Sequence, residues 1–267
     1  MRAFANAHGA ELFLTERSRH ATELAAIAVA DGCEQVVAVG GDGTMNEVAS
    51  ALINSPATLG LVPCGSGDGL GRHLGIHGSV AHALHVLVSG QPRLIDTGYV
   101  NSHPFFTAAG IGFEAHIAES FNRLKRRGFL RYLTTSTRAL RQWKPEHYVV
   151  THGAERTDVR AFTLAVTNSD QYGNNAIITP GARADDGLLD LCAIPPVTVF
   201  NALPLLTRLF AGTIDRQPHI FLRRNHRFVV ERVSAGSLHT DGEIHHAEAR
   251  LEFTIRAASL RIMTPGA

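Results

Sequence analysis

In the first third of the chain, short continuous apolar runs alternate with segments whose apolar residues have helical spacing. Short apolar runs at 35–39 and 58–62 have the length and composition of buried strands. Each is followed by a segment with apolar residues at helical spacing, at 44–53 and 80–88, and a further helical stripe over 21–28 precedes the first run. This order predicts an α/β domain, a doubly wound parallel sheet with helices on its faces.

From about residue 94 onward, short runs of β-branched and aromatic residues are separated by Gly, Asn and Asp, which is typical of antiparallel sheets. Helical stretches at 128–143 and 197–211 interrupt them. We therefore expect an ATP-binding α/β domain over 1–95 and a β-rich domain over 96–267, with the return of the last strand to the first domain left open. The predicted strands include Phe105–Thr107, Tyr148–Thr151, Phe162–Val166, Phe228–Val230 and Leu251–Ile255.

Composition narrows the class of protein. Hydrophobic residues make up 45% of the chain and charged residues 18%, which indicates a soluble globular protein, and a net charge of +1 gives no global attraction to nucleic acid. No apolar run is long enough to span a membrane, so we expect any membrane contact to be peripheral. Three widely separated cysteines fit neither a disulfide framework nor a zinc site and favour a cytoplasmic location.

A glycine-rich segment, Gly40-Gly41-Asp42-Gly43, lies between the first predicted strand and the next helix. Glycines let the backbone approach a ligand closely, and the N–H groups that open the helix point at negative charge. A hairpin turn is the alternative, but the residues after Gly43 have helical spacing. The segment predicts a polyphosphate site with Asp42 as a metal or water ligand. It matches neither the P-loop nor the dinucleotide fingerprint.

A second glycine loop, 63–72, follows the next predicted strand. The carboxyl ends of neighbouring parallel strands share one sheet edge, where ligands bind in open α/β sheets. In this loop Ser66 is a candidate phosphate donor. Arg72 is either a phosphate clamp or a solvated helix residue.

Two acidic clusters lie in the β-rich part, at 185–190 and 241–243. Each contains Asp-Gly, so an ordinary turn is the alternative. Phosphoryl transfer requires carboxylates for magnesium and one more carboxylate for the attacking hydroxyl. We expect Asp241 and Glu243 to lie on one side of an extended segment, as their spacing implies for a strand.

Four ordered motifs together resemble the diacylglycerol kinase catalytic-domain family, which includes bacterial lipid kinases, sphingosine kinases and ceramide kinases. The resemblance extends from about residue 10 to the C-terminus. It implies a β-sandwich-like second domain and ATP- and Mg²⁺-dependent phosphorylation of the hydroxyl of diacylglycerol, a sphingoid base or a related lipid. The motifs are Gly-Gly-Asp-Gly-Thr-Met-Asn-Glu, Pro-Cys-Gly-Ser-Gly-Asp-Gly-Leu, Asp-Asp-Gly-Leu-Leu-Asp and Asp-Gly-Glu.

The resemblance also implies roles for individual residues. Asp241 corresponds to the family's general base, with Glu243 beside it, and the Asp186 carboxylate would hold magnesium together with main-chain oxygens near Arg183 and Leu188. The residues expected at ATP are Thr15, Gly40, Gly41, Asp42, Gly43, Thr44, Met45, Asn46 and Ser66.

Two departures from the family pattern are visible. Members begin with a strand and an Asn-Pro-x-Ser/Thr-Gly loop that this sequence does not contain. We expect this to leave two apolar strand edges open, to weaken the fold and to impair ATP binding. Asp68 stands where relatives carry Asn, and a carboxylate facing phosphates would repel them unless magnesium or Arg72 compensates.

The sequence leaves several alternatives open. A nucleotide-binding pseudo-kinase and an NAD-kinase-like enzyme with a soluble acceptor compete with the lipid kinase, and a homodimer is compatible with the sequence. The basic segment 123–131 is either a membrane-docking face or a solvated helix. The leucine-rich segment 203–210 either lines an acyl-chain pocket or fills the core.

Overall fold

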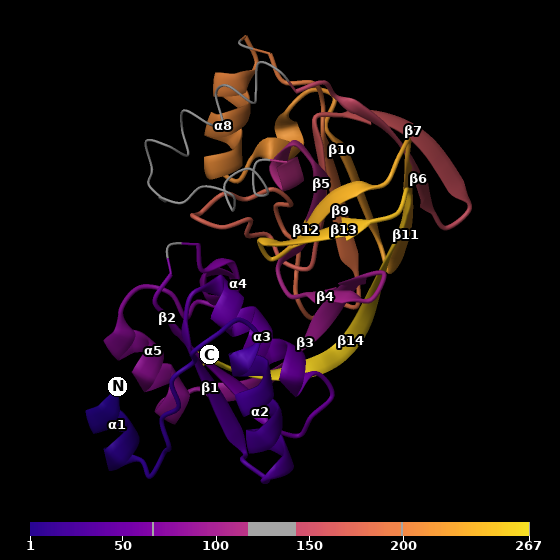
Figure 1. Ribbon diagram of the computed structural model, residues 1–267. Coiled ribbons are helices and arrows are strands. Elements are labelled where there is room, and N and C mark those ends of the chain that lie inside the picture. The colour runs from indigo at the N-terminus through magenta and orange to yellow at the C-terminus, as the bar shows by residue number, and fades with distance from the viewer. Residues whose placement is uncertain (66, 117–142, 199, 267) are drawn as a thin grey trace.

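The structure is a computed structural model that describes residues 1–65, 67–116, 143–198 and 200–266. Its N-terminal part alternates helices and strands, as the hydrophobic pattern predicts (Figure 1). The elements are α1 (Arg2–Ala7), α2 (His20–Ala30), β1 (Gln35–Gly40), α3 (Asp42–Leu52), β2 (Thr58–Pro63), α4 (Gly69–His73) and α5 (Val80–Ser89).

The rest of the chain is mainly strands, with α8 (Ala202–Phe210) and the 3₁₀ turn η1 (Ile214–Arg216) on its outside. The strands of the central stretch are β3 (Gln91–Val100), β4 (His103–Phe105), β5 (Ala108–Gly112), β6 (Glu146–His152), β7 (Glu155–Ala161), β8 (Thr163–Thr167) and β9 (Leu189–Ile194). Those of the last stretch are β10 (Phe221–Asn225), β11 (Arg227–Arg232), β12 (Gly236–Thr240), β13 (Glu243–Ala247) and β14 (Arg250–Thr264).

The described strands form two sheets. An eight-stranded sheet has the order β1-β2-β14-β11-β6-β7, with β3 and β4 attached to β14, and a six-stranded sheet has the order β10-β9-β8-β5-β12-β13. β1 and β2 run parallel, whereas the pairs within the β-rich part are antiparallel. This confirms the predicted fold class, a parallel α/β unit followed by an antiparallel sandwich.

The long strand β14 joins the two parts (Figure 1). Its first half pairs with β11 in the sandwich, and Ile262 near its end pairs in parallel with Leu59 of β2. A register shift between Arg256 and Leu260 divides the two halves. One sheet therefore runs through both parts of the molecule and fixes how they face each other.

The same pairing corrects one expectation. We expected two open apolar strand edges in the nucleotide domain, but β2 is paired on both sides, by β1 and by β14. Among the described strands, the open edges in this domain are those of β1 and of the first half of β3, which pairs only with β14. The prediction was wrong for β2, because a strand from the far end of the chain occupies the position beside it.

Three apolar clusters account for the packing. One lies around β1, β2 and their helices, and a second lies between the two sheets of the sandwich. Alternate residues of β8 and β9 point to opposite faces, so that Leu164 joins the inter-sheet core while Ala165 and Cys192 join a third cluster under α8. The six-stranded sheet is thus covered on both faces.

Candidate active site

The two glycine loops meet at the carboxyl ends of β1 and β2. Gly40 and Pro63 are paired across the strands, and the Cys64 N–H donates to the Gly40 carbonyl at 2.7 Å. A Cβ atom at Gly65 would come within 2.8 Å of the Gly41 Cα. Only glycine allows the two loops to approach this closely, which is why the sequence places glycines at both positions.

An open pocket of about 230 Å³, including the part that opens to solvent, lies at this edge. The part that it encloses is far smaller than the roughly 300–1,000 Å³ of a site that surrounds a whole small ligand, so the pocket is a shallow depression at the sheet edge. Its lining comes from β1, β2, both loops and the start of α3. The residues are Ala38, Gly40, Gly41, Asp42, Met45, Leu61, Val62, Pro63, Gly65 and Asp68.

The N-terminus of α3 opens at this pocket. Gly41 is the N-cap residue in an extended conformation, and no side chain caps the helix. The first free N–H groups of an α-helix carry partial positive charge, and the glycines leave them accessible. This arrangement can hold an anionic group such as a phosphate.

Two carboxylates from different loops lie together beside the pocket. Asp42 accepts hydrogen bonds from the backbone N–H groups of Asp68 at 3.2 Å and Gly69 at 3.3 Å, which ties the loops together. Asp68 is 8% exposed and has a positive φ of 50°. Burial, with the nearby Asp42 charge as the second cause, raises the pKa of Asp68 to about 6, against the opposing charge of Arg72.

Asp241 reaches this region from the β12–β13 hairpin. Its Oδ2 accepts from the Asn46 side-chain amide at 2.9 Å and from the Phe106 N–H at 2.7 Å. Its Oδ1 accepts from the N–H groups of Thr107 at 2.9 Å and Ala108 at 3.0 Å. Burial raises the pKa of Asp241, and the four donors oppose that shift because they favour the charged carboxylate. The Asn46 contact links α3 directly to the β-rich domain.

Glu243 does not share this environment. Asp241 and Gly242 both have positive φ, 48° and 86°, so they form a tight hairpin turn rather than an extended segment. Glu243 begins β13 and is exposed. The expectation that the two carboxylates lie on one side of a strand was therefore wrong, because the turn reverses the chain between them.

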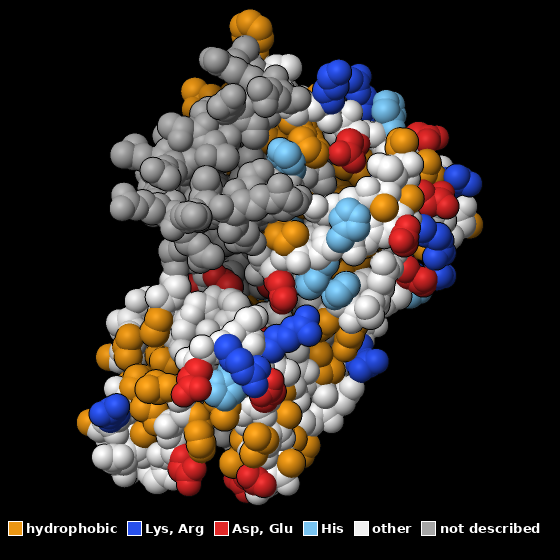
Figure 2. Space-filling view, in the orientation of Figure 1, with side chains coloured by type: hydrophobic (Ala, Val, Ile, Leu, Met, Phe, Trp, Pro, Cys, Tyr) orange, Lys and Arg blue, Asp and Glu red, His pale blue; other side chains and the backbone are white. Residues whose placement is uncertain are grey.

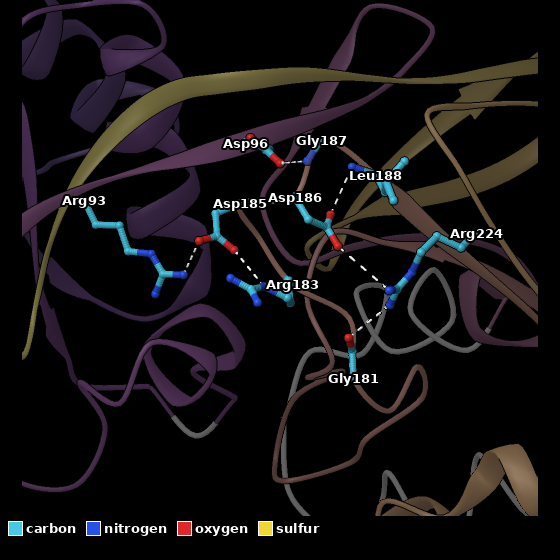
Figure 3. Close-up of polar contacts among 9 residues, drawn as sticks. All are labelled: Arg93, Asp96, Gly181, Arg183, Asp185, Asp186, Gly187, Leu188 and Arg224. Atoms are coloured by element: carbon cyan, nitrogen blue, oxygen red, sulfur yellow. Dashed lines mark hydrogen bonds and ion pairs between the residues drawn. The ribbon is translucent and has the colours of Figure 1, made fainter. Parts of the chain in front are cut away.

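The other acidic cluster forms the loop before β9 (Figure 3). Asp185 pairs with Arg93 and Arg183, and the hydrogen bond from Arg93 is the main cause that lowers the pKa of Asp185. Asp186 accepts from the Leu188 N–H at 3.0 Å. Arg224 lies 3.9 Å from Asp186 but only 2.9 Å from Asp190, so Asp190 is its main partner.

This loop fits a hard cation by its donor chemistry. Asp186 keeps one oxygen only loosely engaged by Arg224, and main-chain carbonyls and a carboxylate are ligands that Mg²⁺ accepts. Within the described residues, no group of three or more His, Cys, Asp or Glu side chains is arranged to hold a metal. A magnesium ion here would therefore depend on main-chain oxygens and water.

Comparisons with known proteins agree with this architecture. The family model of the diacylglycerol kinase catalytic domain matches residues 1–100, and the model of the YegS C-terminal NAD kinase beta sandwich-like domain matches residues 107–264. A probable YegS-like lipid kinase of Pseudomonas fluorescens is 31% identical over 94% of this chain and 84% of its own length. The chain belongs to the diacylglycerol kinase catalytic-domain family.

Other comparisons bear on length and fold. The chain spans 44% of the length of an uncharacterized Synechocystis protein that is 28% identical over 70% of this chain. A putative diacylglycerol kinase of Bacillus anthracis, 19% identical, superimposes with a TM-score of 0.77 over 96% of this chain and 86% of its own. An Archaeoglobus fulgidus NAD kinase in complex with ATP has a TM-score of 0.55 at 12% identity, covering 98% and 87%.

Several residues of this lipid-kinase family member lie away from the pocket. Thr15 is exposed in an irregular segment, and Thr44 packs against Gly40 instead of lining the pocket. Arg72 is half-buried and donates to the Gly67 carbonyl and to Asn175 of the β-rich domain. Ser66 and the basic segment 123–131 lie outside the described residues.

Glu47, the last residue of the first family motif, serves the fold. Its carboxylate accepts from the backbone N–H groups of Arg19 and Ala21, which open α2. It therefore holds α2 against α3, and the Thr22 hydroxyl of α2 donates to the Glu47 carbonyl as well. The motif thus combines glycines that line the pocket with a residue that fixes the neighbouring helix.

The sequence did not single out Asp96. It is 2% exposed, and it accepts from the Gly187 N–H at 2.7 Å and from the Ala258 N–H at 2.8 Å. These bonds hold the acidic loop and the irregular part of β14 against β3 (Figure 3). Its sequence signal is weak, because β3 also contains the polar residues Gln91, Arg93 and Thr97.

A buried polar group on β12 was also missed. His239 lies 3.4 Å from Glu114 and 3.3 Å from the Tyr172 hydroxyl, and burial raises the pKa of Glu114 while His239 opposes the shift. Gly110 leaves room for them, since a Cβ there would meet the Glu114 carboxylate. Figure 2 shows histidine and acidic side chains gathered at the narrow waist between the two parts of the molecule.

Proposed function

We propose that this protein transfers the γ-phosphoryl group of ATP to the hydroxyl of a lipid, with Mg²⁺. The observation that carries the proposal is the contact between Asn46 and Asp241. It brings a carboxylate of the β-rich domain to the helix that opens at the glycine-loop pocket. A nucleotide and an acceptor bound on either side of this contact would meet beside Asp241.

The glycine loops are proposed to hold the phosphates of ATP. The uncapped N-terminus of α3 and the close approach of Gly65 to Gly41 provide backbone donors without interfering side chains. The pocket is proposed to receive phosphate groups and not the adenosine, because it is shallow and opens at the N-terminus of α3. The structure of the NAD kinase in complex with ATP supports this assignment at the level of the fold.

Asp241 is proposed as the general base. The acceptor oxygen attacks the γ-phosphorus, its proton passes to an Asp241 carboxylate oxygen, and the bond from the γ-phosphorus to the bridging oxygen of ADP breaks. Because both Asp241 oxygens already accept two hydrogen bonds, one donor must leave. The Asn46 amide is the candidate, since it is a side chain while the other three donors are backbone.

Magnesium, when bound, would neutralise charge that develops on the phosphates. We propose the Asp186 carboxylate with main-chain oxygens of Arg183 and Leu188 as one magnesium site. Asp42 is proposed to contact the metal network through water, because it lines the pocket and its carboxylate accepts only two long hydrogen bonds.

The acceptor class rests on the relatives. Proteins with similar sequences bear the names probable lipid kinase and diacylglycerol kinase. Diacylglycerol and sphingoid bases both present a primary hydroxyl beside long chains, and either fits the proposed chemistry. A soluble acceptor, as in NAD kinases, is the second candidate because the β-rich part matches an NAD kinase beta sandwich-like model.

The test is to incubate the full chain with γ-labelled ATP, Mg²⁺ and either mixed lipids in detergent micelles or NAD. Label in a lipid supports the proposal, and label in NAD alone replaces the acceptor. ATP binding by calorimetry without transfer to either would identify a nucleotide-binding pseudo-kinase. A diacylglycerol kinase relative run in parallel shows that the assay works.

A further inference from the structure

The helix α8 has one anchored face and one exposed apolar face. Leu205 and Leu209 pack against the cluster on the outer side of the six-stranded sheet, and the Leu209 carbonyl accepts from the Ile177 N–H. These contacts fix the orientation of the helix. We predicted that the leucine-rich segment 203–210 either lines an acyl-chain pocket or fills the core. Of its five large apolar residues, only Leu205 and Leu209 pack in the core.

The opposite face carries large apolar side chains in solvent. Leu203 is 69% exposed, Leu206 49% and Phe210 56%, at helical spacings of three and four residues, and Phe200 just before the helix is 91% exposed. None of the residues of α8 is buried. Apolar side chains exposed singly are ordinary, but three on one short helix and a fourth just before it form a patch that marks an interaction surface.

The charges around this patch are basic. Residues 200–223 contain three arginines and one aspartate, a net charge of +2, compared with +1 for the whole chain. Arg208 lies in the last turn of α8, and the Arg223 guanidinium lies over the Phe221 ring at 4.4 Å. Apolar side chains flanked by arginines match an anionic bilayer surface.

We infer that α8 docks on an anionic lipid bilayer, with Phe200, Leu203, Leu206 and Phe210 inserted among the headgroups. A bilayer fits better than a second copy of this chain. The four side chains expose roughly 400–500 Å² by the usual side-chain areas, whereas a stable protein interface buries about 800 Å² on each partner. Among the described helices none is long and apolar enough to span a bilayer, so α8 would lie on the surface.

This surface differs from the proposed catalytic pocket. α8 lies on the outer side of the sandwich, whereas the glycine loops lie in the N-terminal part (Figure 1). Vesicle binding can therefore be measured without turnover. Only the consequence for activity rests on the proposed lipid acceptor.

The binding experiment uses the full chain and vesicles of phosphatidylcholine with or without about a third phosphatidylglycerol. We expect sedimentation with the anionic vesicles, and a loss of at least about 100-fold in partition for the combined variant Leu203→Ser, Leu206→Ser and Phe210→Ser. Exposed apolar residues elsewhere provide the matched control, Ile27→Ser, Val88→Ser and Val233→Ser, which should bind within about twofold of the parent chain.

The contribution of the arginines to vesicle binding is tested separately. Arg208→Gln and Arg216→Gln should each weaken binding to the anionic vesicles about fivefold and change binding to phosphatidylcholine little. Circular dichroism melting of every variant should stay within a few degrees, because the substituted side chains are exposed.

Three results would overturn the inference. The first is a parent chain that binds no vesicles, and the second is a patch variant that binds as well as the control. The third is a parent chain that sedimentation shows to be a dimer and a patch variant that is a monomer, which would assign the patch to a second copy. If transfer to lipid fails while vesicle binding follows these expectations, the catalytic proposal fails and the docking surface stands.

Discussion

Two aspartates at the meeting point of the domains are held in opposite ways. Asp241 accepts from four N–H donors at 2.7–3.0 Å, which oppose the rise in its pKa that burial causes. Asp68 lies in a narrow loop with the Asp42 carboxylate beside it, and its pKa rises to about 6. Burial is the largest cause of a raised pKa at both carboxylates, and the comparison teaches how neighbours change that effect: four donors oppose it at Asp241, whereas the Asp42 charge adds to it at Asp68.

The two regions also differ in how they are built. The pocket of the N-terminal part depends on glycines that allow backbone to touch backbone, as at Gly65 and Gly41. The β-rich side depends on single carboxylates that gather backbone N–H groups from distant segments, as Asp241 and Asp96 do. Substitutions that change either the close contact of the glycine loops or one of these carboxylates test the comparison.

The largest effect is expected at Asp241. Asp241→Asn removes the proposed proton acceptor, and kcat should fall by about 10²–10⁴ while the affinity for ATP stays within about fivefold. Steady-state kinetics and calorimetry give the two quantities, and the exposed Asp158→Asn is the matched control. A fully active Asp241→Asn enzyme would exclude the base. A variant that loses ATP binding together with its melting transition would leave Asp241 with a purely structural role.

Asp96→Ala tests how much a single buried carboxylate stabilises the fold. Asp96→Ala leaves the Gly187 and Ala258 N–H groups without their acceptor in a buried place, so the free energy of unfolding should fall by about 2–4 kcal/mol. Asp185→Ala, whose arginine partners are about half exposed or more, should cost about 1 kcal/mol or less. Urea unfolding measures both, and equal losses would contradict the difference drawn between them.

Gly65→Ala tests the close approach of the two glycine loops. The added Cβ would lie 2.8 Å from the Gly41 Cα, so the loops must separate, at a cost of about 1–3 kcal/mol in unfolding free energy without nucleotide. Gly43→Ala is the comparison within the same site, because a Cβ at Gly43 meets nothing within 4 Å and its φ is not positive. If both substitutions cost the same, the close approach of the loops is not the cause.

The smallest effect is a gain in stability at Asp68. Because the folded state raises its pKa from 3.8 to about 6, Asp68 contributes stability below pH 4 that is lost as the pH rises to 6. Asp68→Asn should therefore stabilise the fold by about 1–2 kcal/mol at pH 7.5 and by almost nothing at pH 4. Thermal unfolding at the two pH values measures this, and a gain that is independent of pH would point to a cause other than charge.

The sequence predicted the elements of the N-terminal part closely. The strands expected at 35–39 and 58–62 are β1 and β2, and the helix expected to begin after Gly43 is α3. These features depend on residues near one another in sequence, such as apolar spacing and a Ser79 that caps α5 by accepting from the His82 N–H. The four motifs likewise identified the family correctly.

The β-rich part was predicted less well. β7 was missed because Glu155–Ala161 is mostly polar and lies at the edge of its sheet, where one side needs no apolar cover. Glu243 was placed beside Asp241 because an alternating pattern does not reveal a tight turn. The position of the Asp241 hairpin depends on pairing with β5, which is more than a hundred residues earlier.

By itself, the sequence determined the order of strand, glycine loop and helix, the family, and the carboxylates available for chemistry, because spacing and glycine content act locally. The tertiary structure decided which carboxylates meet which donors. The N–H groups that hold Asp241 come from residues 133 to 135 positions earlier, and Asn46 lies 195 positions away. Contacts over such separations arise only from the packing of β14, β5 and β12, which no local pattern encodes.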